Sequence, residues 1–275
     1  MREEPREERA PVRDGYWIAA LAACAALAGC SRAAPSHGPS ARAAEPLAAY
    51  LPPPQIARAY RRGATVVLTG VATPGAVVRL ASPGGAAIAG AADRKGAFSL
   101  AAPAGPAPQL YSLSETAGGR LARAVGYIAV LPAPGPPAAL LRPAAAAALP
   151  PSLIQRGIAA VDYDASGAAM ASGRAAPGDT VRLFLDGKDA GEDAADPAGV
   201  FNASLSLGLA PGPHVLSLAS PRLRTSAGFD AARTSSLAGA YYRVGRLEGA
   251  WRIDWATPGG GVQSTILFDQ RGGRG

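Results

Sequence analysis

Short apolar stretches alternate with turn signals along most of the chain beyond residue 55. Such stretches cover residues 65–69, 77–80, 180–185 and 214–218, with Pro-Gly, Gly-Gly or Asp-Gly pairs between them. Within one stretch, the aliphatic residues Val181, Leu183 and Leu185 occupy every second position. This period of two is typical of a strand with one buried face, so the pattern predicts small antiparallel β-sandwiches. Asp186-Gly187 directly follows and predicts a tight hairpin turn, because Gly tolerates positive φ.

An internal repeat relates the two halves of this region, with a common displacement of 103 positions. The matching residues include Gly70 and Gly173, Pro74 and Pro177, Leu80 and Leu183, Asp93 and Asp196, and Phe98 and Phe201. A shared displacement across so many positions indicates two copies of one module, at 56–131 and 155–235. We expect Leu80, Leu183 and both phenylalanines to point into the cores.

Two low-complexity segments divide the chain into domains. Residues 30–55 are rich in Ala and Pro and have no periodic apolar face, which predicts a flexible tether. Residues 132–154 combine a Pro-rich run with five consecutive alanines and predict a Pro/Ala-rich linker. The expected domains are therefore 56–131 and 155–270.

The end of the second domain carries a further alternating pattern. Trp251, Ile253 and Trp255 occupy every second position, a Gly-rich loop follows at 257–261, and another alternating run covers 262–268. The pattern predicts a C-terminal β-hairpin.

The aromatic residues around this hairpin have two interpretations. Trp251 and Trp255, with Tyr241 and Tyr242 nearby, could form a platform that binds a sugar or a peptide. Alternatively, the tryptophans pack onto the second sandwich. We expect packing, because side chains at i, i+2 and i+4 of a strand share one face.

The N-terminus predicts export. An apolar run at 16–28 has about the length of a signal-peptide core and is too short for a bilayer-crossing helix of ~20 residues. Residues 1–29 are therefore predicted to be a signal peptide. The run ends in Leu-Ala-Gly-Cys-Ser, which resembles the lipobox of bacterial lipoproteins. The resemblance implies that Cys30 carries a lipid anchor and that Ser31 permits sorting to the outer membrane. The alternative is a plain secretory signal in which Cys30 is incidental.

The composition provides few of the residues that usually act in catalysis. The chain has two His, two Cys and two Lys, and one Cys lies inside the predicted signal peptide while the other is Cys30. No phosphate-binding loop or nucleophile elbow occurs. We therefore expect no catalytic residue, no metal and no cofactor. The acidic loop at 186–196 could hold calcium, but a solvated hairpin loop explains it more simply.

The charge balance points to anionic neighbours. The whole chain has a formal net charge of +7, and the chain from residue 30 onward has 23 basic and 15 acidic residues, or +8. Lipopolysaccharide, anionic lipid or cell-wall polymers would suit this charge. The alternative is an arginine-rich composition with no partner behind it, because the arginines are scattered. No basic stripe alternates with aromatics, which argues against nucleic acid as a partner.

The repeated frame also resembles a known family. Pro-Gly, Val-Arg-Leu and Asp-x-x-Gly-x-Phe, as found from Pro74 to Phe98 and from Pro177 to Phe201, resemble bacterial immunoglobulin-like domains that occur in tandem on surface proteins. The resemblance implies a non-catalytic scaffold or binding module. The expected protein is thus anchored to the bacterial cell envelope by lipid, with the membrane and an envelope polysaccharide or another envelope protein as partners. Binding of glycan or peptidoglycan through the C-terminal aromatics is the alternative, and an envelope hydrolase is a weaker one.

Overall fold

The computed structural model describes residues 51–133, 135–150 and 156–269, and this part of the chain is all-β. It contains nineteen strands in antiparallel sheets. Within those ranges there is no helix that could cross a membrane. The predicted fold class of two immunoglobulin-like β-sandwiches with a C-terminal β-hairpin is confirmed. The predicted signal peptide, Cys30, Ser31 and most of the predicted tether lie outside the described residues.

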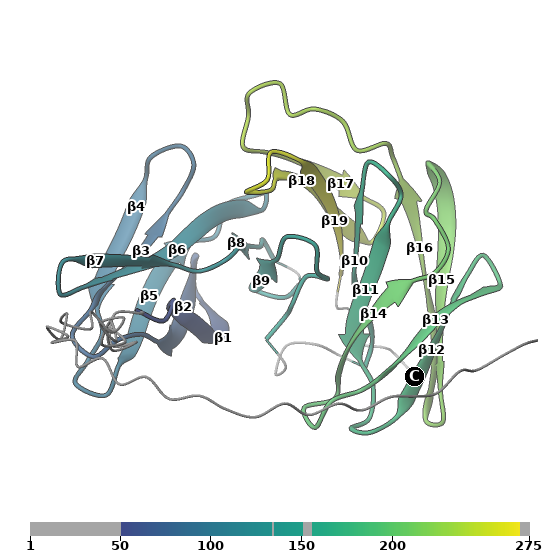
Figure 1. Cartoon of the computed structure of the whole chain (residues 1–275), viewed down its shortest axis with the longest axis horizontal. Helices are drawn as coiled ribbons and strands as arrows, with labels where there is room; N and C mark the ends of the chain where they lie inside the picture. The colour runs from purple at the N-terminus through teal and green to yellow at the C-terminus, as the bar shows by residue number, and fades with distance from the viewer. Residues whose placement is uncertain (1–50, 134, 151–155, 270–275) are drawn as a thin grey trace, which may run out of the picture. The chain divides into compact units, whose positions relative to one another are not determined.

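Two sheets form the first sandwich (Figure 1). One has the strand order β1-β2-β5, and the other has the order β4-β3-β6-β8-β9, with β7 also paired to β6. The strands are β1 Gln55–Arg62, β2 Thr65–Val71, β3 Val77–Ala81, β4 Ala87–Ala91, β5 Ala97–Pro103, β6 Gln109–Ala117, β7 Arg120–Arg123, β8 Tyr127–Val130 and β9 Ala138–Leu141. Leu68 and Leu100 from one sheet share a buried cluster with Leu80 and Leu113 from the other.

The second sandwich has the same two-layer design. Its sheets have the orders β14-β11-β10-β19-β18-β17 and β13-β12-β15-β16. The strands are β10 Gly157–Asp164, β11 Ala169–Arg174, β12 Thr180–Leu185, β13 Lys188–Ala194, β14 Val200–Leu205, β15 Gly212–Ser220, β16 Leu223–Ala231, β17 Tyr242–Leu247, β18 Ala250–Ala256 and β19 Val262–Phe268. Leu183, Phe201 and Leu218 are buried in its core.

The repeat in the sequence is a repeat in the structure. Phe98 lies opposite Gly70 across β2 and β5, and Phe201 lies opposite Gly173 across β11 and β14. A Cβ atom added to Gly70 or Gly173 would come within 2.8 Å or 2.6 Å of the facing phenyl ring. Each glycine therefore makes the space that its phenylalanine fills. Both phenylalanines and both matching leucines are buried, which confirms the predicted orientation.

The same turn precedes the phenylalanine strand in each copy of the module, β5 in the first and β14 in the second. One carboxylate oxygen of Asp93, and one of Asp196, accepts the backbone N–H groups two and four residues further on. Those four hydrogen bonds measure 2.7 or 2.8 Å. Gly96 and Gly199 take φ values of +83° and +81° in the same turns, a conformation that a residue without Cβ adopts at little cost. The motif thus works as a structural turn in both copies.

The hairpin turn predicted at Asp186-Gly187 is confirmed. These two residues connect β12 directly to β13 and have φ values of +52° and +77°. Positive φ at both central positions is the requirement of a type I′ turn, whose twist matches that of the flanking strands.

The predicted linker at 132–154 is more ordered than its composition indicates. Residues 138–141 form β9, which pairs with β8, and Ala148 bridges Leu140. Ala146 and Ala147 are completely buried. The composition of the segment does not show this burial, because composition says nothing about what a segment packs against. Alanine has so small a side chain that an alanine run can lie between two packed surfaces.

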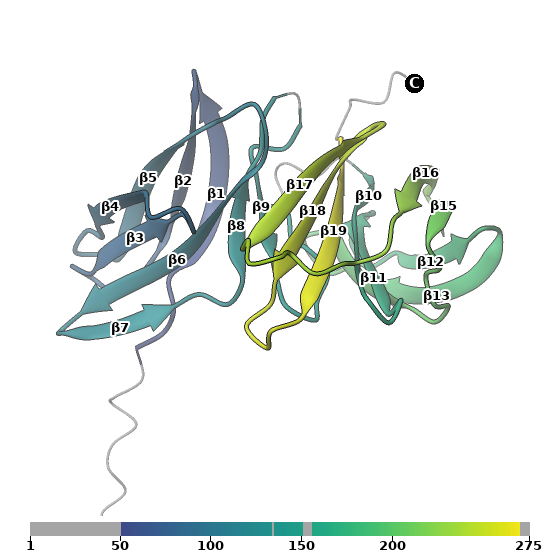
Figure 2. The same ribbon diagram turned by 90° about the horizontal axis from the view of Figure 1, so that it is seen from above.

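The C-terminal hairpin extends a sheet of the second sandwich (Figure 2). Its last strand, β19, pairs along β10, and β18 and β17 follow beyond it. In the first sandwich the strand equivalent to β10 is β1. Within the described residues β1 is an edge strand, and no strand pairs with its outer side. The extension is therefore specific to the second copy of the module.

The buried phenylalanines give a direct test of the repeat. Replacement Phe98→Ala or Phe201→Ala should each lower the free energy of unfolding by about 3–5 kcal/mol, because each leaves a cavity beside its glycine. Urea denaturation followed by circular dichroism measures the change. Val71→Ala, at an exposed position on β2, is the control and should change stability by about 0.5 kcal/mol or less. Equal effects of Val71→Ala and Phe98→Ala would contradict the assignment.

Candidate functional site

A third buried cluster joins the two sandwiches, and we call it the interdomain core. Its members are Leu110, Ala129, Leu131, Ala139, Leu141, Ala147, Leu149, Ala159, Ala160, Ile253, Trp255 and Leu267. They come from β6, β8 and β9 of the first sandwich, from the linker, and from β10, β18 and β19 of the second. The C-terminal hairpin therefore supplies apolar surface to both neighbours.

Trp255 is the largest side chain of the interdomain core and is fully buried. Its ring meets the ring of Tyr127 from the first sandwich edge to face, with centroids 5.8 Å apart. Its indole N–H donates to Thr265 Oγ1 at 3.1 Å. The predicted burial of this residue is correct, but the predicted partner was wrong. Sequence reasoning considered only the adjacent sandwich, whereas the face of β18 that carries Trp255 lies against the first one.

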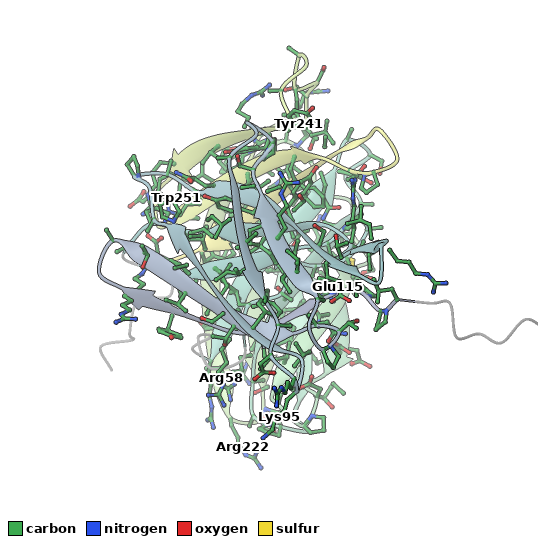
Figure 3. All side chains as sticks on the ribbon, turned by 90° about the vertical axis from the view of Figure 1, so that its left-hand side faces the viewer. Arg58, Lys95, Glu115, Arg222, Tyr241 and Trp251 are labelled. Carbon is green, nitrogen blue, oxygen red and sulfur yellow. The ribbon has the colours of Figure 1, made fainter. Side chains whose placement is uncertain are left out.

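The other three candidate aromatics are placed differently, and Figure 3 labels two of them, Trp251 and Tyr241. Trp251 is half-buried, and the Arg246 guanidinium lies 4.8 Å from its ring centroid. Tyr242 is half-buried and pairs across the strands with Trp255, while Tyr241 is 59% exposed. A flat platform would need all four rings to face solvent together. The burial of Trp255 removes it from any such surface.

A buried carboxylate, Asp162 on β10, lies behind the interdomain core. Its Oδ1 accepts hydrogen bonds from Thr265 and, at 3.1 Å, from Gln263 Nε2, both on β19. Its Oδ2 accepts the backbone N–H of Ala147 in the linker at 2.7 Å. Because Thr265 also accepts the indole N–H of Trp255, one chain of hydrogen bonds links β18, β19, β10 and the linker.

Further bonds hold the same part of the linker. Ser172 Oγ donates to the carbonyl of Ala147 at 2.6 Å. The Gln263 amide donates to the carbonyls of Arg142 and Ala145 and accepts the N–H of Ala144. Side chains of the second sandwich therefore bind four backbone groups of the alanine run, those of Ala144 N, Ala145 O, Ala147 N and Ala147 O. This explains how a segment with few side-chain groups stays buried.

Burial raises the pKa of Asp162 to about 6. Removal from water disfavours the charged form, and the hydrogen bonds from Thr265, Ala147 and Gln263 offset only part of that penalty. A raised pKa in a buried carboxyl is also seen at catalytic sites, but here its donors are structural elements that it ties together.

A buried ion pair, Arg252 with Asp254, lies on the same sheet. Arg252 Nε donates to Asp254 Oδ1 at 2.8 Å, and Ser264 Oγ donates to the same oxygen at 2.7 Å. The Arg252 guanidinium also lies 5.7 Å from the Tyr163 ring centroid. Pairing of the charges on a buried face keeps the extended sheet from carrying an uncompensated charge.

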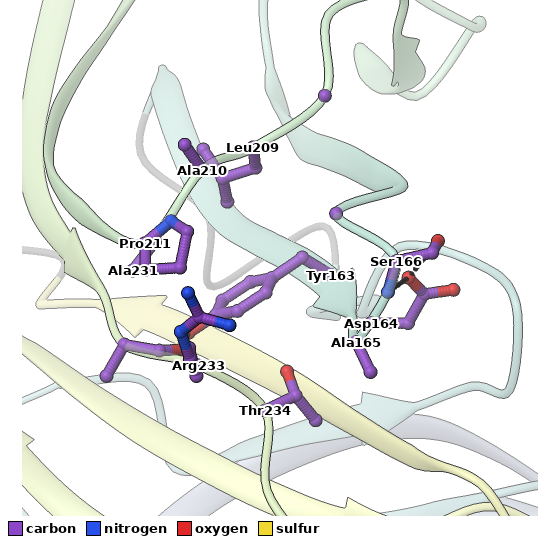
Figure 4. A pocket seen from close by; sticks show the side chains of 13 residues that line it. Tyr163, Asp164, Ala165, Ser166, Leu209, Ala210, Pro211, Ala231, Arg233 and Thr234 are labelled. Atoms are coloured by element: carbon purple, nitrogen blue, oxygen red, sulfur yellow. Dashed lines mark hydrogen bonds between the residues drawn. The ribbon is translucent and has the colours of Figure 1, made fainter.

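A cavity of about 380 Å³ opens beside Tyr163 (Figure 4). Arg233 and Thr234 line one side, and the turn at Asp164 and Ser166 lines another. The Asp164 carboxylate accepts both the N–H and the hydroxyl of Ser166, at 2.8 and 2.6 Å. These bonds lower the pKa of Asp164 and fix it as a turn residue.

The acidic loop at 186–196 serves hairpin structure. Asp186 binds the ring of His214 at 2.7 Å and the N–H of Val215 at 2.9 Å. Asp193 accepts the N–H of Asn202 at 2.7 Å. In the described ranges, no three His, Cys, Asp or Glu side chains converge in a way that could hold a metal ion.

The likeness of this chain to known proteins is slight. No protein-family model and no curated protein matches the sequence. One solved structure with some likeness is titled "Biofilm associated protein - BSP domain", at 14% sequence identity and a TM-score of 0.24. The match covers 66% of this chain and 30% of that one, so this chain spans less than a third of its length.

Asp162 should make the free energy of unfolding decrease as pH rises, which is the opposite of the effect of a carboxylate whose pKa is lowered by folding. The folded chain binds this proton more tightly than the unfolded chain, whose Asp pKa is near 3.8. The free energy of unfolding should therefore fall as pH rises from about 4 to about 6, by about 3 kcal/mol. Asp162→Asn removes this contribution, so the stability of wild type relative to the variant should decline across that window. Urea denaturation at several pH values measures it, and a difference that stays constant would refute the assignment.

The interdomain core is tested by a matched pair of tryptophan variants. Trp255→Ala should lower the free energy of unfolding by about 3–5 kcal/mol, because the ring is fully buried between the sandwiches. Trp251→Ala, on the same face of the same strand but half-buried, should cost less than half as much. Urea denaturation compares the two variants. If both have the same effect, Trp255 does not hold the core together.

Proposed function

We propose that this protein is a non-catalytic, lipid-anchored module of the bacterial cell envelope in which two joined β-sandwiches act as a scaffold or binding support. The interdomain core carries this proposal. Trp255 is buried between the two sandwiches, and the linker binds a buried carboxylate, Asp162. Both features hold the outer surfaces of the two sandwiches in a fixed relation. This is what a scaffold requires.

The use of the buried acids supports a non-catalytic role over a hydrolase. Asp162 and Asp254 hold strands and linker together, as described above. Glu115 is also completely buried, and its two oxygens accept the N–H and the hydroxyl of Thr73 at 3.1 and 2.6 Å. Each of these carboxylates is engaged by neighbours in the fold. A catalytic acid or base would instead need an oxygen that is free to reach a substrate atom. Asp162 borders a cavity of about 300 Å³, but both of its oxygens already accept hydrogen bonds from the fold.

The glycan-binding alternative is weaker. It relied on Trp251, Trp255, Tyr241 and Tyr242 acting together, and a ligand could reach Trp255 only after the sandwiches had separated. The anchoring and the outer-membrane location rest on the lipobox-like residues Cys30 and Ser31. The partners we propose are the membrane, through the anchor, and an envelope polysaccharide or another envelope protein.

Metabolic labelling with palmitate tests the anchor. The full chain expressed in a Gram-negative host should incorporate label and fractionate with the outer membrane. Cys30→Ala should abolish labelling and leave an uncleaved or soluble form. Cys24→Ala, within the predicted signal peptide, is the matched control and should label normally. Label that persists in Cys30→Ala would overturn the assignment.

A further inference from the structure

The two copies of the module differ sharply in charge. Residues 56–131, the first sandwich, contain eight basic and two acidic residues, a net charge of +6. Residues 156–269, the second sandwich, contain ten basic and twelve acidic residues, a net charge of −2. Such asymmetry between halves built on one template points to a surface interaction of the basic copy with an anionic partner.

Part of the contrast lies on one sheet face of each copy. In the first sandwich, Arg79 on β3 and Arg123 on β7 both pair with Ser114 on the strand between them. In the second, Arg182 on β12 and Arg224 on β16 flank Ala219 in the same way. All four arginines are exposed. The two faces therefore present the same pair of arginines, each pair two strands apart.

Only the second pair has acidic neighbours. Arg182 forms ion pairs with Asp189 at 3.6 Å and Glu192 at 3.7 Å, both on β13. The equivalent strand of the first sandwich is β4, whose sequence Ala-Ile-Ala-Gly-Ala has no charged residue. Ala89 lies opposite Arg79 on the neighbouring strand. In the second sandwich the corresponding position opposite Arg182 is Glu192. Neither Arg79 nor Arg123 forms an ion pair within the described residues. Their charge is left for a partner outside the chain.

Apolar side chains accompany these arginines. Val77 and Leu121 project from the same face and are 52% and 56% exposed. The alanines of β4 are too short to shield Arg79 from an approaching surface. We call this side of β4, β3, β6 and β7, with Val77, Arg79, Leu121 and Arg123, the basic face. Exposed apolar residues between unpaired cations are suited to a surface that is both anionic and partly apolar.

We propose that the basic face docks on the anionic phospholipid headgroups of a bilayer. The proposal rests on the lipid anchor proposed above, because the first sandwich follows Cys30 after 24 residues. As a coil, a chain of that length spans about 25–30 Å. An anchored first sandwich can therefore reach the headgroups and approach within the roughly 10 Å over which their attraction acts. The second sandwich, with its acidic β13, remains free for other contacts.

Vesicle binding tests the proposal with matched variants. The chain from residue 30 onward, without the predicted signal peptide and carrying Cys30→Ser so that no lipid is attached, is sedimented with vesicles of equal parts phosphatidylglycerol and phosphatidylcholine. Arg79→Gln with Arg123→Gln should weaken the partition coefficient about 30-fold, since each basic residue near an anionic surface contributes about five-fold. Arg182→Gln with Arg224→Gln should change it less than two-fold. Ala89→Glu, which copies the second sandwich, should weaken binding about five-fold.

Three outcomes would overturn the proposal: equal effects of the two arginine pairs, equal binding to pure phosphatidylcholine vesicles, or binding to soluble polyphosphate without binding to vesicles. The last result would assign the basic face to an anionic polymer. Failure of palmitate labelling at Cys30 would remove the anchor but would not alter this measurement, because the assayed chain carries no lipid.

Discussion

The pairing of β19 with β10 is the interaction on which the arrangement of this protein depends. It carries the C-terminal hairpin onto the second sandwich and turns a strand edge into the middle of a six-stranded sheet. One face of the hairpin then closes the second core through Ala250 and Ile266, while the other presents Ile253 and Trp255 to the first sandwich. Without this pairing Trp255 would lose the surface against which it is buried, and the linker would lose its hydrogen bonds to Gln263.

Much of the fold could be predicted because its signals are local. Alternation in 180–185, the turn at Asp186-Gly187 and the repeated Asp-x-x-Gly-x-Phe each need only neighbouring residues to specify a strand or a turn. The displacement of 103 positions then extended each inference to a second copy. The interdomain core was missed because its parts are remote in sequence: Tyr127 meets Trp255, and Ala147 binds Asp162. Asp162 lies in an apolar run, and a charged residue in such a run is the one signal that could have revealed its buried role.

The duplicated module shows how one template can be put to two uses. The positions that build the fold, such as Leu80 and Leu183 or Gly70 and Gly173, are the same residue in both copies. The positions on the outer faces have diverged, with Ala89 in one copy where Glu192 lies in the other. Core constraints hold the buried set fixed, since a volume change there is felt across the sandwich. The solvent-facing set is free to acquire charge, and the exposed faces are therefore where the two copies can differ in function.

The long separation in sequence between β10 and β19 also governs when the second sandwich can be completed. Ala160 on β10 pairs with Leu267, which lies more than a hundred residues further along the chain. The second edge of β10 is therefore covered only after β19 has been synthesised. A chain that is synthesised from its N-terminus exposes β10 as an open, apolar strand edge throughout that interval, and such edges template pairing with other chains. The first sandwich can form early, whereas the second stays vulnerable until the last strand emerges. Protection of that edge until β19 has been synthesised is thus a requirement that the topology itself imposes.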